Sequence, residues 1–361
     1  MEIEVFSRIG TTGFNYQSSA ILDSFIYLMT ERNYYKANKF SMSYPLSTEA
    51  VKLLKPDTVL LINGCFYYID NETSEDATSG ILKVAGNSLM AKSKTRIVLR
   101  NYNRSARPEL IAHDHLNNEV INPSDNKRKI NYLKLKPTGT LTSSSIQYQN
   151  SYGIVQEEVE ELCLTYDFGF KETASSIVAP ENTIQFFKGR DLSNMVEFTT
   201  DFDNLLSESF ESSNFDEMTT AIVFGEGEGT ARKSVRLNDN LSGLERKELY
   251  VDARDLQKTT DDVTLTDAQY NDTLKARGNK ELAERVSTLL VKGDINLNSD
   301  LFKFGRDYDV GDRVRISSKV FGLSKTALLA GVEETWDEKG HHMTPIWENE
   351  SPTIIDILKR K

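Results

Sequence analysis

The stretch TVLLINGCFYYI, residues 58–69, indicates the fold class more clearly than any other part of the sequence. Two apolar, β-prone runs flank the pair Asn63-Gly64, which accepts the positive φ angles of a tight hairpin turn. We therefore expect a β-hairpin here. Just before it, residues 47–54 predict a short helix that is capped by Ser47 or Thr48 and ends ahead of Pro56.

Residues 20–35 fit both the period of a helix and that of a strand. Ile21, Leu22, Phe25, Leu28 and Met29 suit one face of a helix, whereas the aromatic content of this stretch suits strands. We expect strands, so that β-type segments dominate the first 85 residues.

The pattern between residues 86 and 190 is mixed. It predicts helices at 88–95, 108–119 and 156–166, the second of them opened by Pro108 in its first turn. The polar, Asn- and Ser-rich stretches 117–131 and 138–151 indicate exposed loops.

From residue 183 onward short β-type runs return, interrupted by one helical insertion. Strands are expected at 184–187, 196–199, 221–224, 247–251, 313–320, 327–335 and 343–347, the last three separated by turns at Phe321-Gly322 and 338–340. Within the insertion, about 266–292, Thr266 caps a helix at 267–276 and Gly278 breaks it. A second helix is expected at 281–290, with Leu282, Val286, Leu289 and Leu290 on one face.

Length and composition indicate a globular protein of two or three compact units. The chain has 361 residues, of which 39% are hydrophobic and 27% charged, enough to build several cores. Neither an internal repeat nor a low-complexity linker marks the boundaries, which we place near residues 85 and 190. The class predicted from these patterns is α+β, rich in β-structure.

Charge and hydropathy bear on partners and location. The 43 basic and 54 acidic residues give a net charge of −11, which disfavours binding of nucleic acid by a basic surface. The longest apolar runs, 58–63 and 287–291, are far shorter than a membrane-spanning helix needs. Residues 1–6 alternate acidic and apolar side chains, unlike a secretory signal, so we expect the protein to stay in the cytoplasm where it is made.

The residues that could carry metal or redox chemistry do not form a recognisable site. Cys65 and Cys163 lie in unrelated apolar segments and are expected to be buried free thiols. Residues 113–115, His-Asp-His, place two histidines on different sides of a helix with no third ligand nearby, so a solvated helix face is expected. The pair His341-His342 is expected at a surface turn. No metal or cofactor is predicted.

Catalytic motifs are equally weak. The run GEGEG, residues 225–229, lacks the P-loop spacing, because three residues separate its last glycine from Lys233, and its two glutamates would repel phosphate. It is expected to be a turn between two strands. The acidic run 157–161 could offer paired carboxylates, but it begins a helix, where negative charge complements the dipole. No Gly-x-Ser-x-Gly motif occurs, and no catalytic residue is predicted.

Several segments, in order along the chain, resemble the baseplate hub, or tail-tip platform, proteins of long-tailed phages and phage-derived tail machines. The segment NKFSMSYP, residues 38–45, is similar to the family's Gly-x-Phe-x-Leu-x-Leu-Pro, with Asn38 in place of glycine. Residues 53–55 with the Asn63-Gly64 hairpin and the segment LKVAGNSL, residues 82–89, follow. The most specific block is GLERKELYVDARDL, residues 243–256, after which come Arg277-Gly278, 281–283 and YDVGDRV, residues 308–314.

The resemblance covers residues 2 to 347 and implies β-barrel-like tail-tube domains joined by mixed α/β domains in a trimeric ring. The tube domains would be residues 1–85 and 191–361, the latter carrying the insertion at 266–292, with a mixed α/β domain at 86–190. Such a subunit would close the tail tube, carry the tail tip or fibres and form the exit channel for DNA or tape protein. Its partners would be distal tail or tail-tube, tape-measure and receptor-binding or fibre proteins, and its location the virion tail.

Some members of that family extend into peptidoglycan-cleaving domains, an extension we do not expect here because the sequence ends soon after its last β run. Two other classes of function remain open. A tail-tip enzyme acting on cell walls or carbohydrates would need a cleft with two suitably spaced carboxylates. A carbohydrate-binding module would use exposed aromatic residues such as Trp336 and Trp347, which we expect instead in the core or at an interface. The sequence therefore favours a structural protein without enzymatic activity.

Overall fold

A computed structural model describes residues 1–9, 15–73, 77–99, 101–176, 180–229, 232–260 and 264–347. Strands make up 41% and helices 21%, which confirms the predicted β-rich α+β class. The strands are β1 (Ile3–Arg8), β2 (Tyr16–Leu22), β3 (Tyr27–Asn33), β4 (Lys39–Pro45), β5 (Val59–Ile62), β6 (Cys65–Thr73), β7 (Ile81–Ser88), β8 (Asn101–Ala106), β9 (Leu133–Leu135), β10 (Ile146–Ser151), β11 (Gly169–Ser176), β12 (Glu181–Phe187), β13 (Glu197–Phe198), β14 (Ser209–Ser213), β15 (Thr220–Phe224), β16 (Ser234–Leu237), β17 (Glu248–Asp252), β18 (Thr288–Lys292), β19 (Arg313–Ser318), β20 (Leu323–Asp337) and β21 (Gly340–Trp347). The α-helices are α1 (Thr48–Leu53), α2 (Pro108–Leu116), α3 (Val155–Tyr166) and α4 (Asp267–Ala283).

The predicted hairpin consists of β5 and β6, and its turn has the expected geometry. Asn63 and Gly64 adopt φ angles of +46° and +72°, which an Asn-Gly pair tolerates well. The short helix before it is α1, where the Ser47 hydroxyl accepts a hydrogen bond from the Ala50 amide at 3.0 Å. Residues 20–35 contribute the end of β2 and all of β3, as predicted.

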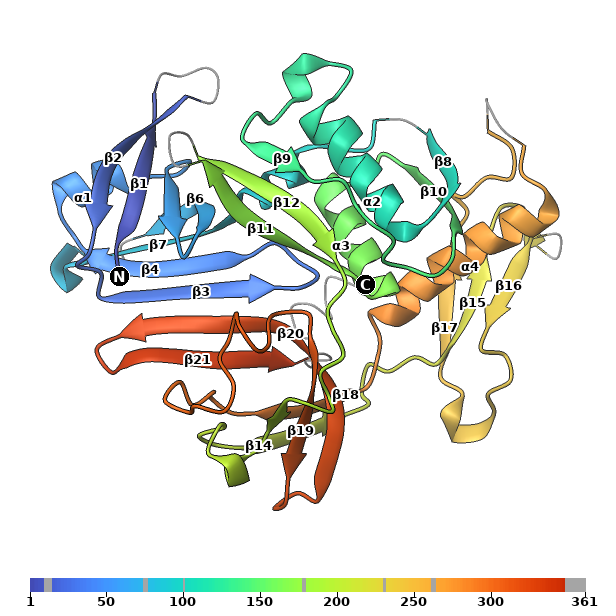
Figure 1. Cartoon of the computed structure of the whole chain (residues 1–361). Helices are drawn as coiled ribbons and strands as arrows, with labels where there is room; N and C mark the ends of the chain where they lie inside the picture. The colour runs from blue at the N-terminus through green and yellow to red at the C-terminus, as the bar shows by residue number, and fades with distance from the viewer. Residues whose placement is uncertain are drawn as a thin grey trace.

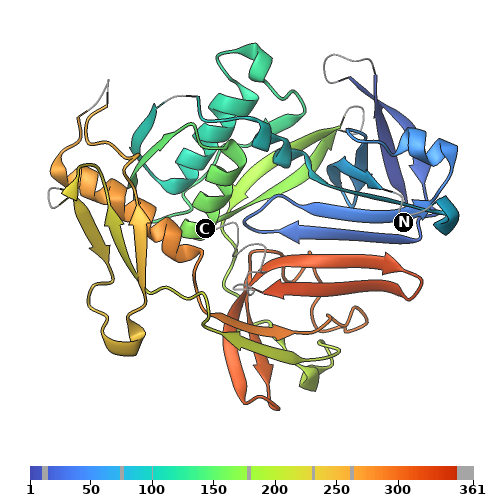
Figure 2. The same ribbon diagram turned by 180° about the vertical axis from the view of Figure 1, so that it is seen from behind.

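One large sheet joins strands from the N-terminal part of the chain to β19, β20 and β21, the last described strands. Its strand order is β13-β19-β20-β3-β4-β7-β6-β5-β1-β2, with β21 paired to β20. The junction is antiparallel pairing of β20 with β3, from Gly331 opposite Asn33 to Trp336 opposite Leu28. Figures 1 and 2 show β3 and β4 beside β20 and β21. The order is open, and among the described strands no sheet closes into a barrel.

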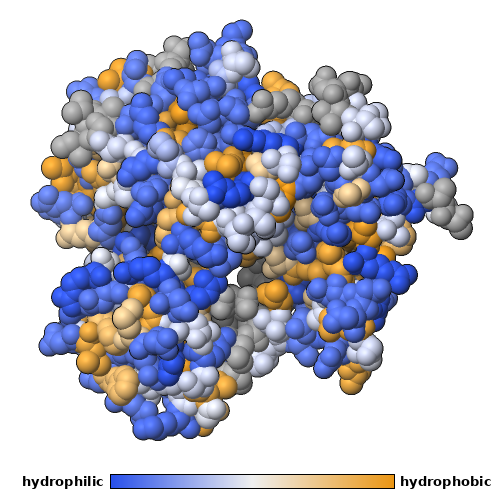
Figure 3. All heavy atoms as spheres, turned by 45° about the vertical axis from the view of Figure 1, so that its right-hand side comes forward, coloured by the Kyte–Doolittle hydropathy of each residue, from blue (hydrophilic) through white to orange (hydrophobic). Residues whose placement is uncertain are grey.

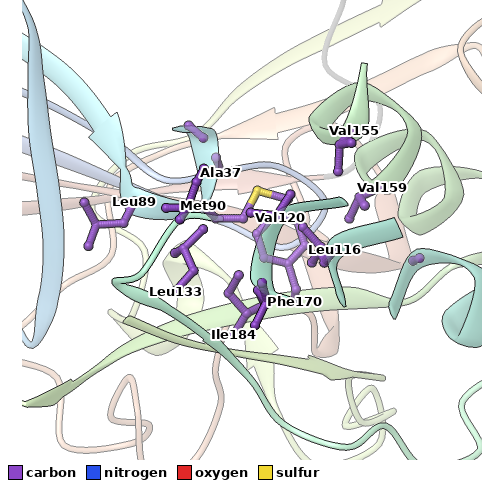
Figure 4. Packing of buried hydrophobic residues seen from close by; sticks show 14 of the residues in the cluster. Ala37, Leu89, Met90, Leu116, Val120, Leu133, Val155, Val159, Phe170 and Ile184 are labelled. Carbon is purple, nitrogen blue, oxygen red and sulfur yellow. The ribbon is translucent and has the colours of Figure 1, made fainter. Parts of the chain in front are cut away.

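A mixed α/β unit packs between this sheet and the rest of the molecule. The helices α2 and α3 cover the paired strands β8 and β10 and the three-stranded sheet β11-β12-β9. Figure 4 shows side chains of α2, α3, β9, β11 and β12 in one apolar core, which also includes Tyr102 and Ala106 of β8. Burial of this apolar surface is the main force that fixes α2 and α3 against the strands.

The predicted helices of this unit are confirmed with small changes of type. Residues 89–95 form a 3-10 helix, Pro108 begins α2, and α2 continues into a π turn at Asn117–Ile121. The prediction of loops was wrong at two places: residues 117–121 are helical, and 146–151 form β10. β10 exists because it pairs with β8, about 45 residues earlier in the chain, which no local pattern reveals.

The strands β15, β16 and β17 and helix α4 form a separate lobe, which we call the α4 lobe. Its own core comprises Ala221, Val223, Val251, Ala253, Leu256, Leu265, Tyr270 and Leu274. Thr266 caps α4 as predicted, through a capping box with Gln269. The predicted break at Gly278 and the helix at 281–290 were wrong, because α4 continues to Ala283 and residues 288–292 form β18, paired with β14.

The remaining predicted strands are confirmed as β12, β13, β15, β17, β19, β20 and β21, with a turn at Phe321-Gly322 between β19 and β20. The division of the chain near residues 85 and 190 stays a prediction. β7 runs through residue 85, and residue 190 lies in the connection between β12 and β13. Within the described ranges, no helix is long and apolar enough to cross a membrane.

Candidate functional site

The candidate functional site is a joint at the centre of the molecule, where four parts of the chain meet around Tyr34. This side chain, just after β3, is fully buried. Its amide donates to the carbonyl of Ala330 in β20 at 2.8 Å, and its carbonyl accepts from the amide of Phe170 in β11 at 3.1 Å. The Gly189 amide, after β12, donates to its hydroxyl at 3.1 Å. Tyr34 thus connects the large sheet to the α/β unit.

Glycines allow this close approach. Gly311 has a φ of +94°, and a Cβ on it would lie 2.6 Å from the ring of Tyr34. A Cβ on Gly189 would overlap the carbonyl of Gly311. Neither position therefore accepts a larger side chain without moving the joint. The packing explains why glycine occupies residue 311 of the YDVGDRV block.

The charged side chain of Asp312 also stabilises the joint. Its carboxylate is 3% exposed and accepts hydrogen bonds from the backbone amides of Arg190 at 2.8 Å and Asp309 at 3.0 Å. The guanidinium of Arg190 donates to the same carboxylate, with the shortest distance 2.5 Å. A buried carboxylate with this many donors is fully satisfied. It anchors the connection after β12 to the turn before β19.

A second ionic contact links α3 to the joint. Asp167, which ends α3 at a φ of +54°, accepts from the Tyr35 hydroxyl at 3.1 Å and from the Arg313 guanidinium at 3.0 Å. The ammonium of Lys188 lies 3.3 Å from its other oxygen. The burial of Tyr35 and its contact with Asp167 raise the pKa of this tyrosine above its usual value. The end of α3 is therefore held to the segment after β3 and to β19.

A buried polar network around Glu172 lies between the large sheet and β11. The Glu172 carboxyl accepts from the Met90 amide at 2.9 Å, from the Asn182 side chain at 2.9 Å and from the Ser88 hydroxyl. Asn182 also donates to the Phe66 carbonyl at 3.2 Å. Burial raises the pKa of Glu172 from 4.5 to about 7, against the lowering effect of its three donors. The network joins β6, β7 and β12 through hydrogen bonds.

Both cysteines are buried free thiols, as predicted. Burial raises the pKa of Cys65 and of Cys163, which keeps both thiols protonated and poorly reactive. Within the described residues no three His, Cys, Asp or Glu side chains are grouped closely enough to hold a metal ion.

The histidines lie partly as predicted. His115 contradicts the expectation of a solvated helix face, because it is fully buried beside the rings of Tyr102 and Tyr148, with centroids 4.7 and 5.8 Å away. A histidine can lie in the core when neighbouring rings pack against it. The His341-His342 pair lies at the start of β21 next to the surface turn, as expected, and His341 stacks on Trp336 at 4.6 Å.

The tryptophans do not form an exposed binding face. Trp347 is 3% exposed and lies within the core that surrounds β19 and β20, as expected. Trp336 is half-buried between the core of the N-terminal sheet and His341. The run at 225–229 lies in the connection from β15 to β16, as predicted, and the Glu226 amide donates a hydrogen bond to the Tyr270 hydroxyl at 2.8 Å. Thr230 and Ala231 lie outside the described residues.

The acidic run begins α3, as predicted, but its carboxylates have specific partners. The Tyr148 hydroxyl donates to Glu158, the Ala37 amide donates to Glu160 at 2.9 Å, and Glu161 forms an ion pair with Lys280 of α4. Burial raises the pKa of Glu161 from 4.5 to about 7, although Lys280 opposes this shift. The cavity beside Glu158 and Glu161 measures about 30 Å³, room for a water molecule and too little for a sugar ring.

Sequence reasoning missed most of the joint. The YDVGDRV block indicated that Gly311 and Asp312 matter, but nothing local pointed to Tyr34, Gly189 or Arg190. Their partners lie more than 100 residues away in sequence. A buried tyrosine and an exposed one look alike in a single sequence.

Solved structures share this fold. The prophage tail protein gp18 of Listeria monocytogenes EGD-e has 13% identity and a TM-score of 0.55, with 99% of this chain and 98% of that chain covered. A tail protein of prophage MuSo2 from Shewanella oneidensis has 12% identity and a TM-score of 0.53, with 96% of this chain and 98% of that chain covered. The tail protein of Neisseria meningitidis MC58 has 14% identity and a TM-score of 0.53, with 97% of each chain covered.

A search of curated proteins found no match. The family described as Siphovirus ReqiPepy6 Gp37-like proteins matches residues 2–346, nearly the whole chain. The match confirms the resemblance to phage tail proteins that the ordered sequence blocks predicted. The chain belongs to this family of Siphovirus ReqiPepy6 Gp37-like tail proteins.

Proposed function

We propose that this tail protein is a structural subunit of the baseplate hub. It closes the tail tube, carries the tail tip or fibres and forms the exit channel for DNA or tape protein. Its partners are the distal tail or tail-tube protein, the tape-measure protein and receptor-binding or fibre proteins, and it lies at the tip of the virion tail. The family and the fold shared with tail proteins over nearly the full length support this proposal.

The observation that carries the proposal is the open edge of the large sheet at β2. Among the described strands β2 pairs only with β1, and its residues Tyr16–Leu22 contain neither a charge nor a proline. Ile21 on this strand is 63% exposed. Open edges without such features attract further strands. Pairing of β2 with a neighbouring copy would cover the edge, which fits a closed ring of subunits.

We infer a ring of three copies. Native mass spectrometry of the purified protein, and of hubs released from particles, tests this number. The expected result is a species with three times the mass of the chain. A strictly monomeric protein in hubs released from intact particles would contradict the ring.

We further propose that the subunit has no hydrolytic activity. Glu158 and Glu161 belong to the acidic run that could offer paired carboxylates, but Glu158 accepts a hydrogen bond from Tyr148, Glu161 pairs with Lys280, and the cavity beside them is too small for a sugar ring. Incubation of the protein with host cell walls should release no soluble fragments. Release that disappears in Glu158→Gln would identify the protein as an enzyme.

A further inference from the structure

The α4 lobe is connected to the rest of the chain at one place. Residues 214–219 lead into it from β14 and residues 284–287 lead out of it to β18. The two links lie side by side, since the Met218 amide donates to the Arg285 carbonyl at 2.9 Å. The hydrophobic core of the lobe is separate from the other cores of the molecule. Figure 1 places the lobe at one side of the molecule, and Figure 3 turns this side forward. This arrangement is that of a hinge.

The far side of the lobe docks on the α/β unit through largely polar contacts. α4 lies against α3 and β10. Gln149 of β10 and Gln257 of the lobe exchange two hydrogen bonds, at 3.1 and 3.3 Å, and Glu161 pairs with Lys280. The cavity of about 30 Å³ lies within this contact. Such a surface carries less apolar burial than a core, so less free energy opposes its separation.

We propose that the α4 lobe is a hinged module that separates from α3 and β10 about its two adjacent links while the sheets keep their fold, with the Glu161–Lys280 pair setting how firmly it docks. This inference goes beyond the proposed hub function and does not depend on it. A lobe that moves in this way would let one subunit adopt two shapes.

The charges around Glu161 determine how docking depends on pH. Those that face it are Glu158 of α3, Arg277 and Lys280 of α4 and Glu284 directly after α4, while β10 contributes the uncharged Tyr148. Burial raises the pKa of Glu161 to about 7 in the docked lobe, and exposure on opening returns it towards 4.5. The docked state therefore binds the extra proton. Docking is firmest below about pH 4.5, weakens as the pH rises through 7, and is loosest above that.

Thiol labelling of Thr273→Cys tests the hinge. Thr273 lines the cavity from α4 and is 2% exposed. Native Cys65 and Cys163 are buried outside the lobe and report opening of the rest of the molecule in the same sample. Each rate, measured by peptide mass spectrometry at pH 8, is divided by the rate of the same cysteine in the denatured chain. We expect the cysteine at 273 to react at least roughly tenfold faster than the other two. Equal protection of all three would overturn the proposal.

Two variants in this background should act in opposite directions. Glu161→Gln removes the ionised carboxylate and should slow labelling at pH 8 by at least roughly tenfold, because the shift from 4.5 to about 7 exceeds one pKa unit and each unit corresponds to a tenfold change in equilibrium. Lys280→Met leaves the carboxylate without its cation and should speed labelling. The exposed Glu157→Gln is the matched control and should change nothing. Equal rates in all four proteins would also overturn the proposal.

Hydrogen exchange of the unsubstituted protein provides a test that needs no variant. The Gln257 amide donates to Gln149 across the contact, whereas the Val223 amide lies inside the lobe's own sheet. After correction for intrinsic rates, the Gln257 amide should exchange faster at pH 8 than at pH 6, with no such change at Val223. If exchange of both amides changed with pH in the same way, the lobe would be unfolding and not moving as a rigid body.

Discussion

At the scale of single residues, the fold depends on buried polar side chains that connect distant segments. In the sequence, Asp312 stands out only as part of the YDVGDRV block, residues 308–314. The structure places it against Arg190, 122 residues away, where it accepts bonds from both the amide and the guanidinium. A burial pattern can be predicted from local sequence, but a partner so far away cannot.

Substitution of Asp312 by asparagine should destabilise the protein by about 2–3 kcal/mol, because the Arg190 guanidinium loses its charged partner and the buried amide cannot satisfy the same donors. Urea unfolding followed by tryptophan fluorescence measures the change. Asp309→Asn is the matched control, since Asp309 is exposed, and about 0.5 kcal/mol or less is expected there. Equal effects of the two substitutions would show that the joint is not held by Asp312.

Glu172 should make stability depend on pH. Its pKa is about 7 in the folded protein and near the ordinary 4.5 in the unfolded chain, so folding retains a proton between these values. The contribution is complete below about pH 4.5 and is lost as the pH rises through 7. Glu172→Gln should remove it, and the free energy of unfolding should fall less between pH 5 and pH 8, by roughly 1–3 kcal/mol. Unchanged pH dependence in this variant, beside a Glu157→Gln control, would contradict the assignment.

At the scale of helices and strands, sequence patterns succeeded where local chemistry decides. The Asn63-Gly64 turn, the Ser47 and Thr266 caps and the proline that opens α2 all lie where predicted. The sequence patterns failed where tertiary packing determines the structure. Gly278 has the residue type of a helix break, yet α4 continues through it, because the absence of a side chain lets α4 approach β15 and β16.

Gly278→Val tests that explanation. A Cβ at this position would lie 2.7 Å from the Val223 side chain and would also overlap Leu237, so the branched side chain should push α4 away from the sheet. We expect the substitution to destabilise the protein by about 2–3 kcal/mol. Asn279→Val places the same residue on the exposed side of the helix and should cost less than about 1 kcal/mol. Similar melting temperatures for the two variants would refute the packing role.

At the scale of the whole molecule, the ordered blocks of sequence predicted the family, and the β-rich α+β class followed from composition and period. The pairing of β3 with β20 could not be predicted, since it joins segments about 300 residues apart. The joint around Tyr34 depends on that pairing and remained hidden with it. The separate α4 lobe was also missed, because its second helix was expected where β18 lies.

Charge leads to a prediction about the assembled channel. The chain has a net charge of −11, and three copies around one axis would surround the channel with a strong negative field. We expect acidic side chains to outnumber basic ones on the channel wall, so that DNA or an acidic tape protein slides through without binding. Purified rings should show no DNA binding at low salt in a filter assay that detects a basic control protein. Tight, salt-sensitive binding would contradict a channel that lets DNA pass.

The proposal that this chain forms the tip of a phage tail can be tested on whole particles. The most direct measurement is electron microscopy of particles in which the protein carries a gold label, with averaging of the tail-tip density. We expect a label at the end of the tail tube and a density with threefold symmetry into which three copies fit. A label along the tube or on the head, or a tip without threefold symmetry, would contradict it.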